Sequence, residues 1–529
     1  MQKKSVTTNR VRVLTPEQDS LKQKPLKVLI VIAESAPYAS VAGLSRTAPY
    51  LARAISALGH DVRIFMPKFG LIDETKYKME MIYKDLKVPT GLGVAPQFLI
   101  CNVKMHKEEE GVPTYFLENQ EYYEQRANVY GYSDDQVRWA LLARGCLEFV
   151  KVSDWKPDVI HSNDWHTGMV PNYMASNYAK DEIISKISSL FTIHNMQFQG
   201  MFDHHNISDL DFDDGRSQIA SFFSERLSKQ NFMKRGIIYA DAVNTVSETY
   251  AREILTPAFG EGIDRLLIEL RSKLFGVVNG IDYNEFNPAT DKLVKYNFDV
   301  ETVSRRKLNK IALQKDFGLP EKEDAFLVGI VSRLVEQKGI DLIGEVMRPF
   351  LKDFNAQLVV VGGGDNKYID LFKDLQKNFP TKVSCHLMLN YTLPRMVFSG
   401  CDVVLIPSRF EPCGVVQLEA MRYGAVPIVR HTGGLADTVE NFDSAKGTGT
   451  GFSFNDFDRW AFFAQLVRAY EVFQNDTVWN KLVKRVMLAD FSWEHSAKEY
   501  VRLYERAIHF RNQRLASDGD STPKGLYEN

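Results

Sequence analysis

The feature that most constrains the fold of this sequence is an apolar run, Val28 to Ala33 within KVLIVIAE, that no polar residue interrupts. A strand of this kind is buried on both faces, which is typical of a parallel sheet. The next segment, TAPYLARAISALGH (residues 47–60), has apolar residues at helical spacing and Gly59 near its end. A second strand, DVRIFMP (61–67), follows, and this order predicts the opening of a doubly wound α/β sheet.

The same pattern restarts in the second half of the chain, soon after the Asn279-Gly280 turn. Its segments are AFLVGIVSRL (325–334), GIDLIGEVMRPFLKDF (339–354), QLVVVGGGD (357–365), DVVLIPSRFE (402–411) and VPIVRHTGG (426–434). Because 529 residues are too many for one compact core, we predict two Rossmann-like domains. The polar, turn-rich segment 284–298 is expected to lead from the first to the second.

Charge and cysteine content exclude several classes of protein. The 65 basic and 67 acidic residues nearly cancel, so neither nucleic acid nor an acidic membrane surface is an expected partner. Five scattered cysteines argue for a reducing compartment and against a disulfide or zinc framework. The first 25 residues lack the apolar core of a secretory signal, and no apolar run has membrane-spanning length. We therefore expect a cytoplasmic protein; the sequence gives no oligomeric state.

The segment richest in candidate chemistry is SRFEPCGVVQLEAMRYGAVPIVRHTGGLADTV, residues 408–439. Glu411 follows a predicted strand, at the carboxyl end where open α/β sheets bind ligands. Cys413 and Gly414 offer a turn with backbone N–H groups at a helix start, and Glu419 is expected two helical turns after Glu411 on the same face. The loop Thr432-Gly433-Gly434 suits close approach by a ligand. Glutamates paired on a helix are more often structural, but the combination in this order is specific.

These motifs resemble those of the glycogen/starch synthase family of glycosyltransferases, from residue 27 to about 505. Further matching segments are HSNDWHTG (161–168), FTIHNMQFQGMF (191–202), YADAVNTVSETYAREI (239–254), VVNGIDYNEFNP (277–288), VSRLVEQKGIDL (331–342) and FSWEHSAKEY (491–500). The resemblance implies a GT-B fold, in which two Rossmann-like doubly wound domains face a central cleft. It also implies a retaining glucosyltransferase of glycogen biosynthesis, which transfers glucose from ADP-glucose, or less favourably UDP-glucose, to the non-reducing end of an α-1,4-glucan.

The resemblance divides the chain into five parts. They are a flexible N-terminal tail (1–25), a starch-synthase-type domain on the acceptor side (26–278), a glycosyltransferase domain on the donor side (279–490), a C-terminal helix that crosses back to the N-terminal domain (491–514) and a flexible tail (515–529).

Four residues match the family's catalytic positions. Arg333 and Lys338 match its basic pair, and two fixed cations are what a departing nucleoside diphosphate needs in the absence of a metal. We expect no metal or other cofactor, because no D-x-D cluster is suitably placed. Glu411 matches the carboxylate beside the donor glucose; we favour an orienting role over a nucleophilic one. His166 matches a histidine near an oxocarbenium-like centre, where its backbone carbonyl could assist; a hydrogen-bonded structural histidine is the less favoured alternative.

The remaining candidate residues bind the donor or the acceptor by the same resemblance. The further donor-side positions are Gly43, Asn279, Cys413, Gly414, Glu419, Thr432, Gly433, Gly434 and Tyr391, with Tyr391 as a weak candidate for stacking on the nucleobase. The acceptor-side positions are Asp134, His166 and Asn195. Asp135 could be confused with Asp134, and an Asn-Gly pair such as that at Asn279 is also an ordinary turn.

The first loop departs from the family pattern K-x-G-G-L. Ser40 stands in place of the lysine, Ala42 in place of the first glycine, and Arg46 where aspartate is usual. Loss of one charge-assisted contact costs roughly 1.5–3 kcal/mol, which is about one to two decades in rate. Two alternatives therefore stay open: a weakened or non-catalytic homologue that binds glucan or regulates another enzyme, and a related nucleotide-sugar transferase with a small acceptor.

Overall fold

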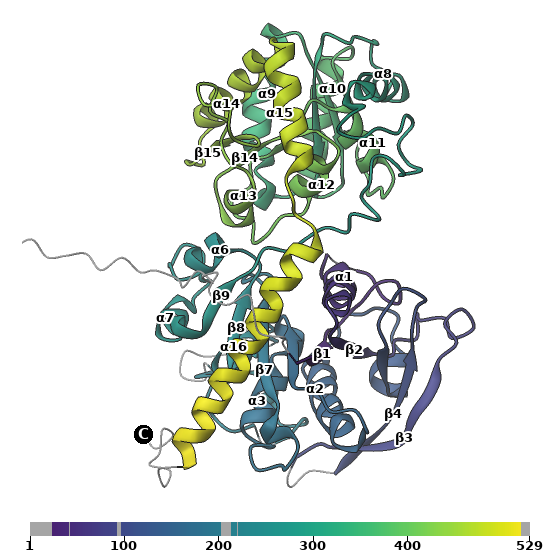
Figure 1. Cartoon of the computed structure of the whole chain (residues 1–529), viewed down its shortest axis with the longest axis vertical. Helices are drawn as coiled ribbons and strands as arrows, with labels where there is room; N and C mark the ends of the chain where they lie inside the picture. The colour runs from purple at the N-terminus through teal and green to yellow at the C-terminus, as the bar shows by residue number, and fades with distance from the viewer. Residues whose placement is uncertain (1–23, 42, 92–96, 203–212, 220, 520–529) are drawn as a thin grey trace, which may run out of the picture. The chain divides into compact units, whose positions relative to one another are not determined.

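The computed structural model describes residues 24–41, 43–91, 97–202, 213–219 and 221–519 (Figure 1). The chain divides into two compact units. Unit 1 comprises Met1–Val246, Ala251–Val277 and Ser496–Asn529, and unit 2 comprises Ser247–Tyr250 and Val278–His495. The expected tail 1–25 lies almost entirely outside the described residues, as do residues 520–529 of the second tail.

Unit 1 is built on a nine-stranded sheet with the order β3-β4-β5-β2-β1-β6-β7-β8-β9. Its strands are β1 (Lys27–Val31), β2 (Asp61–Pro67), β3 (Glu80–Pro89), β4 (Phe98–His106), β5 (Thr114–Glu118), β6 (Val159–Asn163), β7 (Ser188–Ile193), β8 (Ala242–Thr245) and β9 (Leu274–Gly276). All neighbours pair in parallel except β3–β4 and β4–β5. β1 lies between β2 and β6, so the strand order changes direction there and the loops after β1 and β6 flank a topological switch point.

The helices of unit 1 include the one predicted after the first strand, which the structure places at α1 (Leu44–Ala57), with Gly59 at φ +94° beyond its end. The others are α2 (Asp135–Val152), α3 (Met169–Ala175), α4 (Glu225–Ser228), α5 (Phe232–Tyr239), α6 (Glu248–Glu253), whose first residues belong to unit 2, α7 (Asp264–Glu269) and the long α16 (Trp493–Gly519). The expectation that residue 515 begins a tail differs from the structure, in which residues 515–519 are still helical.

The side chains of α16 explain why most of this helix belongs to unit 1. The Tyr504 hydroxyl lies 3.0 Å from Nδ1 of His161 on β6, and the Tyr500 hydroxyl accepts a hydrogen bond from Asn244 on β8 at 3.2 Å. The helix, yellow in Figure 1, accordingly lies along the strands of this sheet. Both tyrosines are fully buried, so the contact combines apolar burial with satisfied polar groups.

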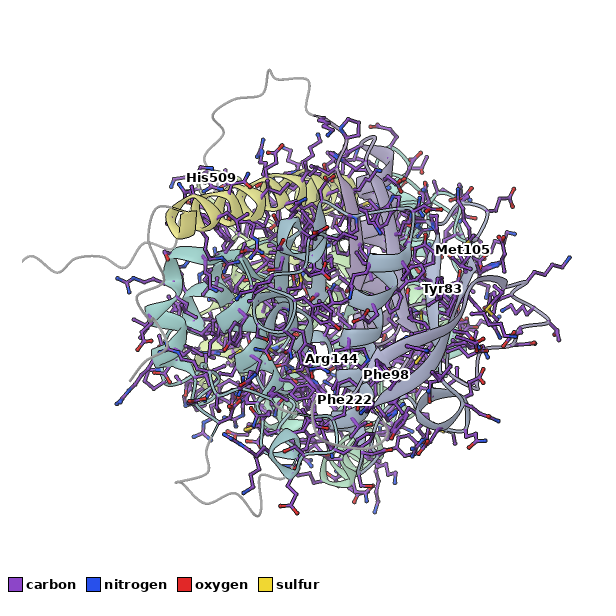
Figure 2. The ribbon with its side chains drawn as sticks, turned by 90° about the horizontal axis from the view of Figure 1, so that it is seen from below. Tyr83, Phe98, Met105, Arg144, Phe222 and His509 are labelled. Atoms are coloured by element: carbon purple, nitrogen blue, oxygen red, sulfur yellow. The ribbon has the colours of Figure 1, made fainter. Side chains whose placement is uncertain are left out.

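The antiparallel hairpin β3–β4 forms one edge of the unit 1 sheet. Arg144 of α2 holds its end, because Nη1 donates to the Pro89 carbonyl at 2.8 Å and the guanidinium lies 5.2 Å from the Phe222 ring. Figure 2 shows Arg144, Phe98 and Phe222 close together, with Tyr83 further along the hairpin. Phe98 is 46% exposed, which leaves the outer face of this hairpin partly apolar.

Unit 2 has a six-stranded, wholly parallel sheet with the order β12-β11-β10-β13-β14-β15. The strands are β10 (Phe326–Val331), β11 (Ala356–Val361), β12 (Val383–His386), β13 (Val403–Ile406), β14 (Val426–Arg430) and β15 (Phe452–Phe454), and the helices are α8 (Arg306–Asp316), α9 (Ile340–Asp353), α10 (Asn366–Asn378), α11 (Leu393–Gly400), α12 (Val416–Arg422), α13 (Gly433–Thr438), α14 (Arg459–Phe473) and α15 (Asp476–Leu488). β10 lies between β11 and β13, which makes the loops after β10 and β13 the pair at this switch point.

The strands predicted from continuous apolar runs are buried in the structure. Phe326, Val328 and Ile330 of β10 have no exposed surface, as expected for a parallel strand covered on both faces. The five cysteines are free thiols. Within the described part of the chain, no helix is both long and apolar enough to cross a membrane.

Candidate functional site

The switch point of unit 2 brings Lys338 and Glu411 into direct contact. Lys338 ends a short helical turn (Glu336–Lys338) after β10, and Glu411 lies in the loop between β13 and α12. The Lys338 ammonium donates to Glu411 Oε2 at 2.6 Å. This confirms that Glu411 follows the carboxyl end of a strand. Because only 8% of the Glu411 side chain is exposed, against 19% for Lys338, the pair is largely shielded from solvent screening.

A glycine fixes the turn that carries Lys338. Gly339 has φ +68°, and a Cβ at this position would lie 2.1 Å from the Pro407 carbonyl oxygen. No other residue permits both the left-handed backbone and this close approach. The Gln-Lys-Gly sequence is therefore what allows the loop after β10 to pack on the loop after β13.

Ser408 is a second partner of Glu411 that sequence reasoning did not identify. Its hydroxyl is fully buried and donates to the same Oε2 atom at 3.0 Å. Two hydrogen bonds thus converge on one carboxylate oxygen, which fixes the orientation of the group. Its position in the sequence could have identified it, because Ser408 is the second residue after the apolar run of the strand.

The loop after β14 packs directly on the backbone around Glu411. Gly433 has φ +45°, and a Cβ there would lie 1.9 Å from the Glu411 carbonyl oxygen; a Cβ on Gly434 would lie 2.0 Å from the Cys413 carbonyl oxygen. The Gly434 N–H donates to the Glu411 carbonyl at 3.1 Å, and Thr432 is fully buried. These glycines allow close approach, as expected. What they approach in this structure, however, is the protein's own loop after β13.

Asn279 and Cys413 also meet in unit 2. The backbone N–H of Asn279 hydrogen-bonds to the Cys413 sulfur, and burial raises the pKa of this thiol to about 12, so the thiol stays protonated at neutral pH. The Asn279 Oδ1 atom is buried and has no hydrogen-bond partner among the described residues. Gly414, next to Cys413, has φ +70°. A buried acceptor without a partner is a candidate to receive a ligand hydroxyl.

Arg333, Tyr391 and Glu419 are donor-side candidates whose positions differ from those of the Lys338–Glu411 cluster. Arg333 is exposed, and within the described ranges its guanidinium makes no ion pair. Tyr391 is 78% exposed. The expectation that Glu411 and Glu419 share one helix face is wrong, because α12 begins only at Val416 and Glu411 lies outside it. The positive φ of Gly414 is incompatible with a helix that extends back to Glu411.

His166 of unit 1 lies in an aromatic cluster after β6. Its ring stacks on Trp165 with centroids 3.8 Å apart, and the rings of Tyr130 and Trp139 lie 4.9 and 5.0 Å away. Burial, with His194 and Arg138 contributing, holds the pKa of His166 well below its usual range, so the ring is neutral. Its Nδ1 atom has no hydrogen-bond partner within the described chain.

Two buried carboxyl groups accompany His166 at the unit 1 switch point, and neither was identified from the sequence. Asp164 has φ +61°, and burial raises its pKa to about 7. Glu34, after β1, accepts the Val41 N–H at 2.5 Å and also hydrogen-bonds to Tyr130. The signal for both was again a polar residue immediately after a buried strand. Glu34 links the first loop to the aromatic cluster around His166.

The acceptor-side aspartates differ in their partners. Asp135 accepts the Gly131 N–H at 2.9 Å and pairs with the fully buried Arg138 at 2.5 Å, which makes it a structural group. Asp134 pairs with Arg126 at 2.6 Å, and its Oδ1 atom has no partner among the described residues. Asp134 is therefore the one with an acceptor available to a ligand. Asn195 is half-buried, and its Oδ1 atom accepts the Gln197 N–H at 3.0 Å.

The first loop shows what replaces the family lysine. The Ser40 hydroxyl is 2.7 Å from the Ser45 hydroxyl, so it satisfies a neighbouring side chain. Gly43 caps the start of α1 and has open space around the position of a Cβ. Arg46 is exposed in the first turn of α1, and Ala42 lies outside the described residues.

One group of three carboxylates among the described residues has metal-ligand spacing, but two lysines already pair with it. Oxygen atoms of Glu74, Glu118 and Glu124 in unit 1 lie within 4.8 Å of one another. Lys68 bridges Glu74 and Glu124 at 2.8 and 3.2 Å, while Lys104 contacts Glu74 at 3.0 Å and also pairs with Glu118. The ammonium groups supply the positive charge that a metal ion would otherwise supply.

Comparisons with known proteins agree with this arrangement. Residues 27–269 match the family model of the starch synthase catalytic domain, and residues 313–471 match that of glycosyl transferases group 1. The chain is 40% identical over 493 residues to a glycogen synthase from Clostridium perfringens, covering 92% of this chain and 99% of the relative.

Solved structures give the same result. The catalytic domain of starch synthase IV from Arabidopsis thaliana, bound to ADP and acarbose, superposes with a TM-score of 0.79 at 31% identity and covers 92% of this chain and all of that one. Sucrose-phosphate synthase from Thermosynechococcus elongatus, at 18% identity and a TM-score of 0.53, covers 92% of this chain and 99% of its own and shares the fold alone. The predicted GT-B fold with two Rossmann-like domains is confirmed.

Proposed function

The chain is a glycosyltransferase of the glycogen/starch synthase family, and we propose that it transfers glucose from ADP-glucose to the non-reducing end of an α-1,4-glucan with retention of configuration. The observation that carries the proposal is the shielded Lys338–Glu411 pair at the switch point of the unit 2 sheet. The starch synthase IV structure, bound to ADP and acarbose, supports a nucleotide-sugar donor and a glucan acceptor.

Lys338 and Arg333 are the groups that we assign to the diphosphate. The leaving nucleotide gains negative charge as the glycosidic bond breaks, and fixed cations stabilise that charge most where water is excluded. Lys338 is already oriented by Glu411, and Arg333 has no competing ion pair in the described ranges. Two such cations supply the charge that a metal ion provides elsewhere, so we propose that the reaction proceeds without one.

Glu411 is assigned to orient the donor glucose. Its Oε2 atom already accepts from Lys338 and Ser408, whereas its Oε1 atom accepts no hydrogen bond from any described residue. Oε1 is thus available to a sugar hydroxyl. A carboxylate held in an ion pair is a weak nucleophile, and this favours orientation over attack. Retention would then arise from attack by the acceptor on the face that the diphosphate leaves.

The test is transfer of labelled glucose to glycogen from ADP-glucose and from UDP-glucose, each with and without a chelator. We expect incorporation from ADP-glucose in an α-1,4 linkage, with no loss when divalent cations are removed. No incorporation from either donor would overturn the proposal. Transfer only to sugar phosphates or other small acceptors would instead support the related transferase.

A weakened homologue is the second candidate, and Ser40 is the observation that favours it. The Ser40 hydroxyl is committed to Ser45 and carries no charge. A loop of this kind offers the diphosphate at most a neutral contact. Under this alternative the chain would bind glucan normally and transfer glucose slowly.

A further inference from the structure

Asp164, the residue after β6 in unit 1, has a backbone conformation that residues with a side chain rarely adopt. Its φ is +61° and its ψ is 176°, a region that glycine alone ordinarily occupies. Two backbone hydrogen bonds hold it there: its N–H donates to the Thr192 carbonyl at 2.9 Å, and its carbonyl accepts the Thr167 N–H at 3.0 Å. Strain of this kind persists only where the surrounding structure enforces it, and it is found most often at functional sites.

The Asp164 carboxyl group joins the two loops that carry the acceptor-side candidates. The backbone N–H groups of Trp165, in the loop after β6, and of His194, in the loop after β7, donate to it. These two residues are the immediate chain neighbours of His166 and Asn195. Because β6 and β7 are adjacent parallel strands, one carboxyl group fixes two loops at the sheet edge where ligands bind.

The two oxygens of this carboxyl group are not equivalent. Oδ1 of Asp164 is buried and has no hydrogen-bond partner among the described residues. A buried carboxyl group with a purely structural role usually has its oxygens satisfied. Burial raises the pKa of Asp164 to about 7, whereas burial holds the pKa of His166 well below its usual range and lowers that of His194 to about 4. Asp164 therefore changes its charge near neutral pH, and the two imidazoles stay neutral.

Two further elements face this turn. Tyr130, before α2, hydrogen-bonds to Glu34 after β1; burial, with Glu34 and Asp164 contributing, raises the pKa of the phenol well above its usual range, so it stays neutral. Arg138 of α2 is already paired with Asp135. Within the described ranges Asp164 makes no ion pair of its own, so no bound cation fixes its charge.

We propose that Asp164 is a positioning residue for glucose transfer, whose carboxyl group fixes the turn of His166 and holds it most firmly when ionised. The inference rests on the proposed function and on the expected place of the His166 backbone carbonyl near the reacting centre. Hydrogen bonds from N–H groups to a carboxylate are about twice as strong as those to a neutral group. Displacement by about 1 Å at a reacting centre costs about 10² in rate. Transfer should therefore be faster above about pH 7 than below it.

The test is the pH dependence of kcat for transfer to glycogen in the wild type, Asp164→Asn and Asp164→Gly. Asparagine keeps an oxygen that can accept the two N–H groups but cannot ionise, and glycine suits the backbone conformation but has no carboxyl group. We expect the wild-type kcat to rise about tenfold between about pH 6 and pH 8. Asp164→Asn should lack this rise, and Asp164→Gly should lower kcat about 10²-fold at the higher pH. The KM for ADP-glucose should not change in either variant.

Asp241→Asn is the matched control. Asp241 is also buried and accepts a backbone N–H, from Ser189 at 2.8 Å, but it precedes β8 and so lies at the opposite end of the sheet. This variant should lose stability and keep the wild-type pH dependence of kcat. A rise in kcat that persists in Asp164→Asn, or a wild-type kcat that is constant over this range, overturns the inference. A kcat of Asp164→Gly within about threefold of the wild type does the same.

Absence of transfer by the wild type at every pH would be a failure of the proposed function instead. In that case, infrared difference spectra recorded between the two pH values decide the question. A protonated-carboxyl band that titrates near neutral pH in the wild type and is lost in Asp164→Asn supports the inference, and equal spectra of the two proteins refute it.

Discussion

Replacement of Lys338 by alanine should destabilise unit 2 as well as slow catalysis. The variant leaves the Glu411 carboxylate, 8% exposed, with Ser408 as its remaining side-chain partner. Removal of one member of a fully buried ion pair costs about 3–5 kcal/mol. Lys338 is 19% exposed, so water can enter the vacated space, and we expect about 2 kcal/mol instead. For a unit of this size, that lowers the unfolding temperature by about 4–8 °C.

Arg333→Ala is the matched control, because it removes the other proposed diphosphate cation from an exposed position without an ion pair in the described chain. Its unfolding temperature should stay within about 2 °C of the wild type, since such surface changes alter stability by at most about 0.5 kcal/mol. Both variants should lose about 10²–10³ in kcat/KM for ADP-glucose, the usual cost of removing one electrostatic stabiliser of a transition state.

The double variant Lys338→Met/Glu411→Leu tests the physical cause. If an unpaired buried charge is what destabilises Lys338→Ala, removal of both charges should restore much of the lost stability without restoring activity. The measurements are scanning calorimetry and initial rates of glucose transfer. Equal unfolding temperatures for Lys338→Ala and Arg333→Ala would refute the buried-pair reasoning. Activity within about threefold of the wild type in either variant would refute the diphosphate assignment.

Three further predictions concern the loops and the buried histidines. Ser40→Lys should raise kcat/KM by roughly ten- to a hundredfold in the transfer assay, because it restores a charge-assisted contact; an unchanged rate contradicts the weakened-homologue reading. Gly433→Ala should lower the stability of unit 2 by about 2–4 kcal/mol and abolish transfer, because its Cβ meets the Glu411 carbonyl at 1.9 Å. The control Gly447→Ala also changes a glycine with positive φ (+66°), but no atom lies within 4 Å of its Cβ position. It should lower the free energy of unfolding by only about 1 kcal/mol. Urea titration measures the loss in both variants. Burial lowers the pKa of His161 to about 3 and of His194 to about 4, so on acidification below pH 6.5 the unfolded chain binds protons that the folded unit does not. Stability should therefore fall between pH 7 and 5, by about 2 kcal/mol per histidine at pH 5. Asp164 offsets part of this loss, because burial raises its pKa to about 7 and the folded unit therefore binds its proton first. Urea midpoints that do not change over this range would disprove the prediction.

Much of the fold could be predicted because it depends on local patterns. Continuous apolar runs marked β1 and β10 as buried parallel strands, since a strand covered on both faces needs no polar residue. The residues after the parallel strands, above all after β13 and β14, contained most of the candidate site, because ligands bind at the carboxyl ends of parallel strands. Glu411 was placed correctly by this rule alone.

The error about Glu419 shows where local reasoning stops. A spacing of eight residues fits two helical turns, but the turn at Gly414 delays the start of α12 to Val416. The left-handed backbone of Gly414 allows close contact with Gln417, and this contact belongs to the tertiary packing of the loop. The spacing of apolar residues shows which face of a helix is buried, but it does not give the residue at which the helix begins. That residue depends on what the preceding loop contacts.

The sequence by itself determined the two α/β halves, the strands within them and the loops in which chemistry is placed, because these follow from side-chain polarity over a few neighbouring residues. Only the tertiary structure decided that Lys338 meets Glu411 across 73 residues of chain, that Ser408 shares the same carboxylate oxygen, and that Gly433 packs on the Glu411 backbone. These contacts depend on β10 lying between β11 and β13. That order is set by the packing of whole helices and strands against one another, which no local pattern records.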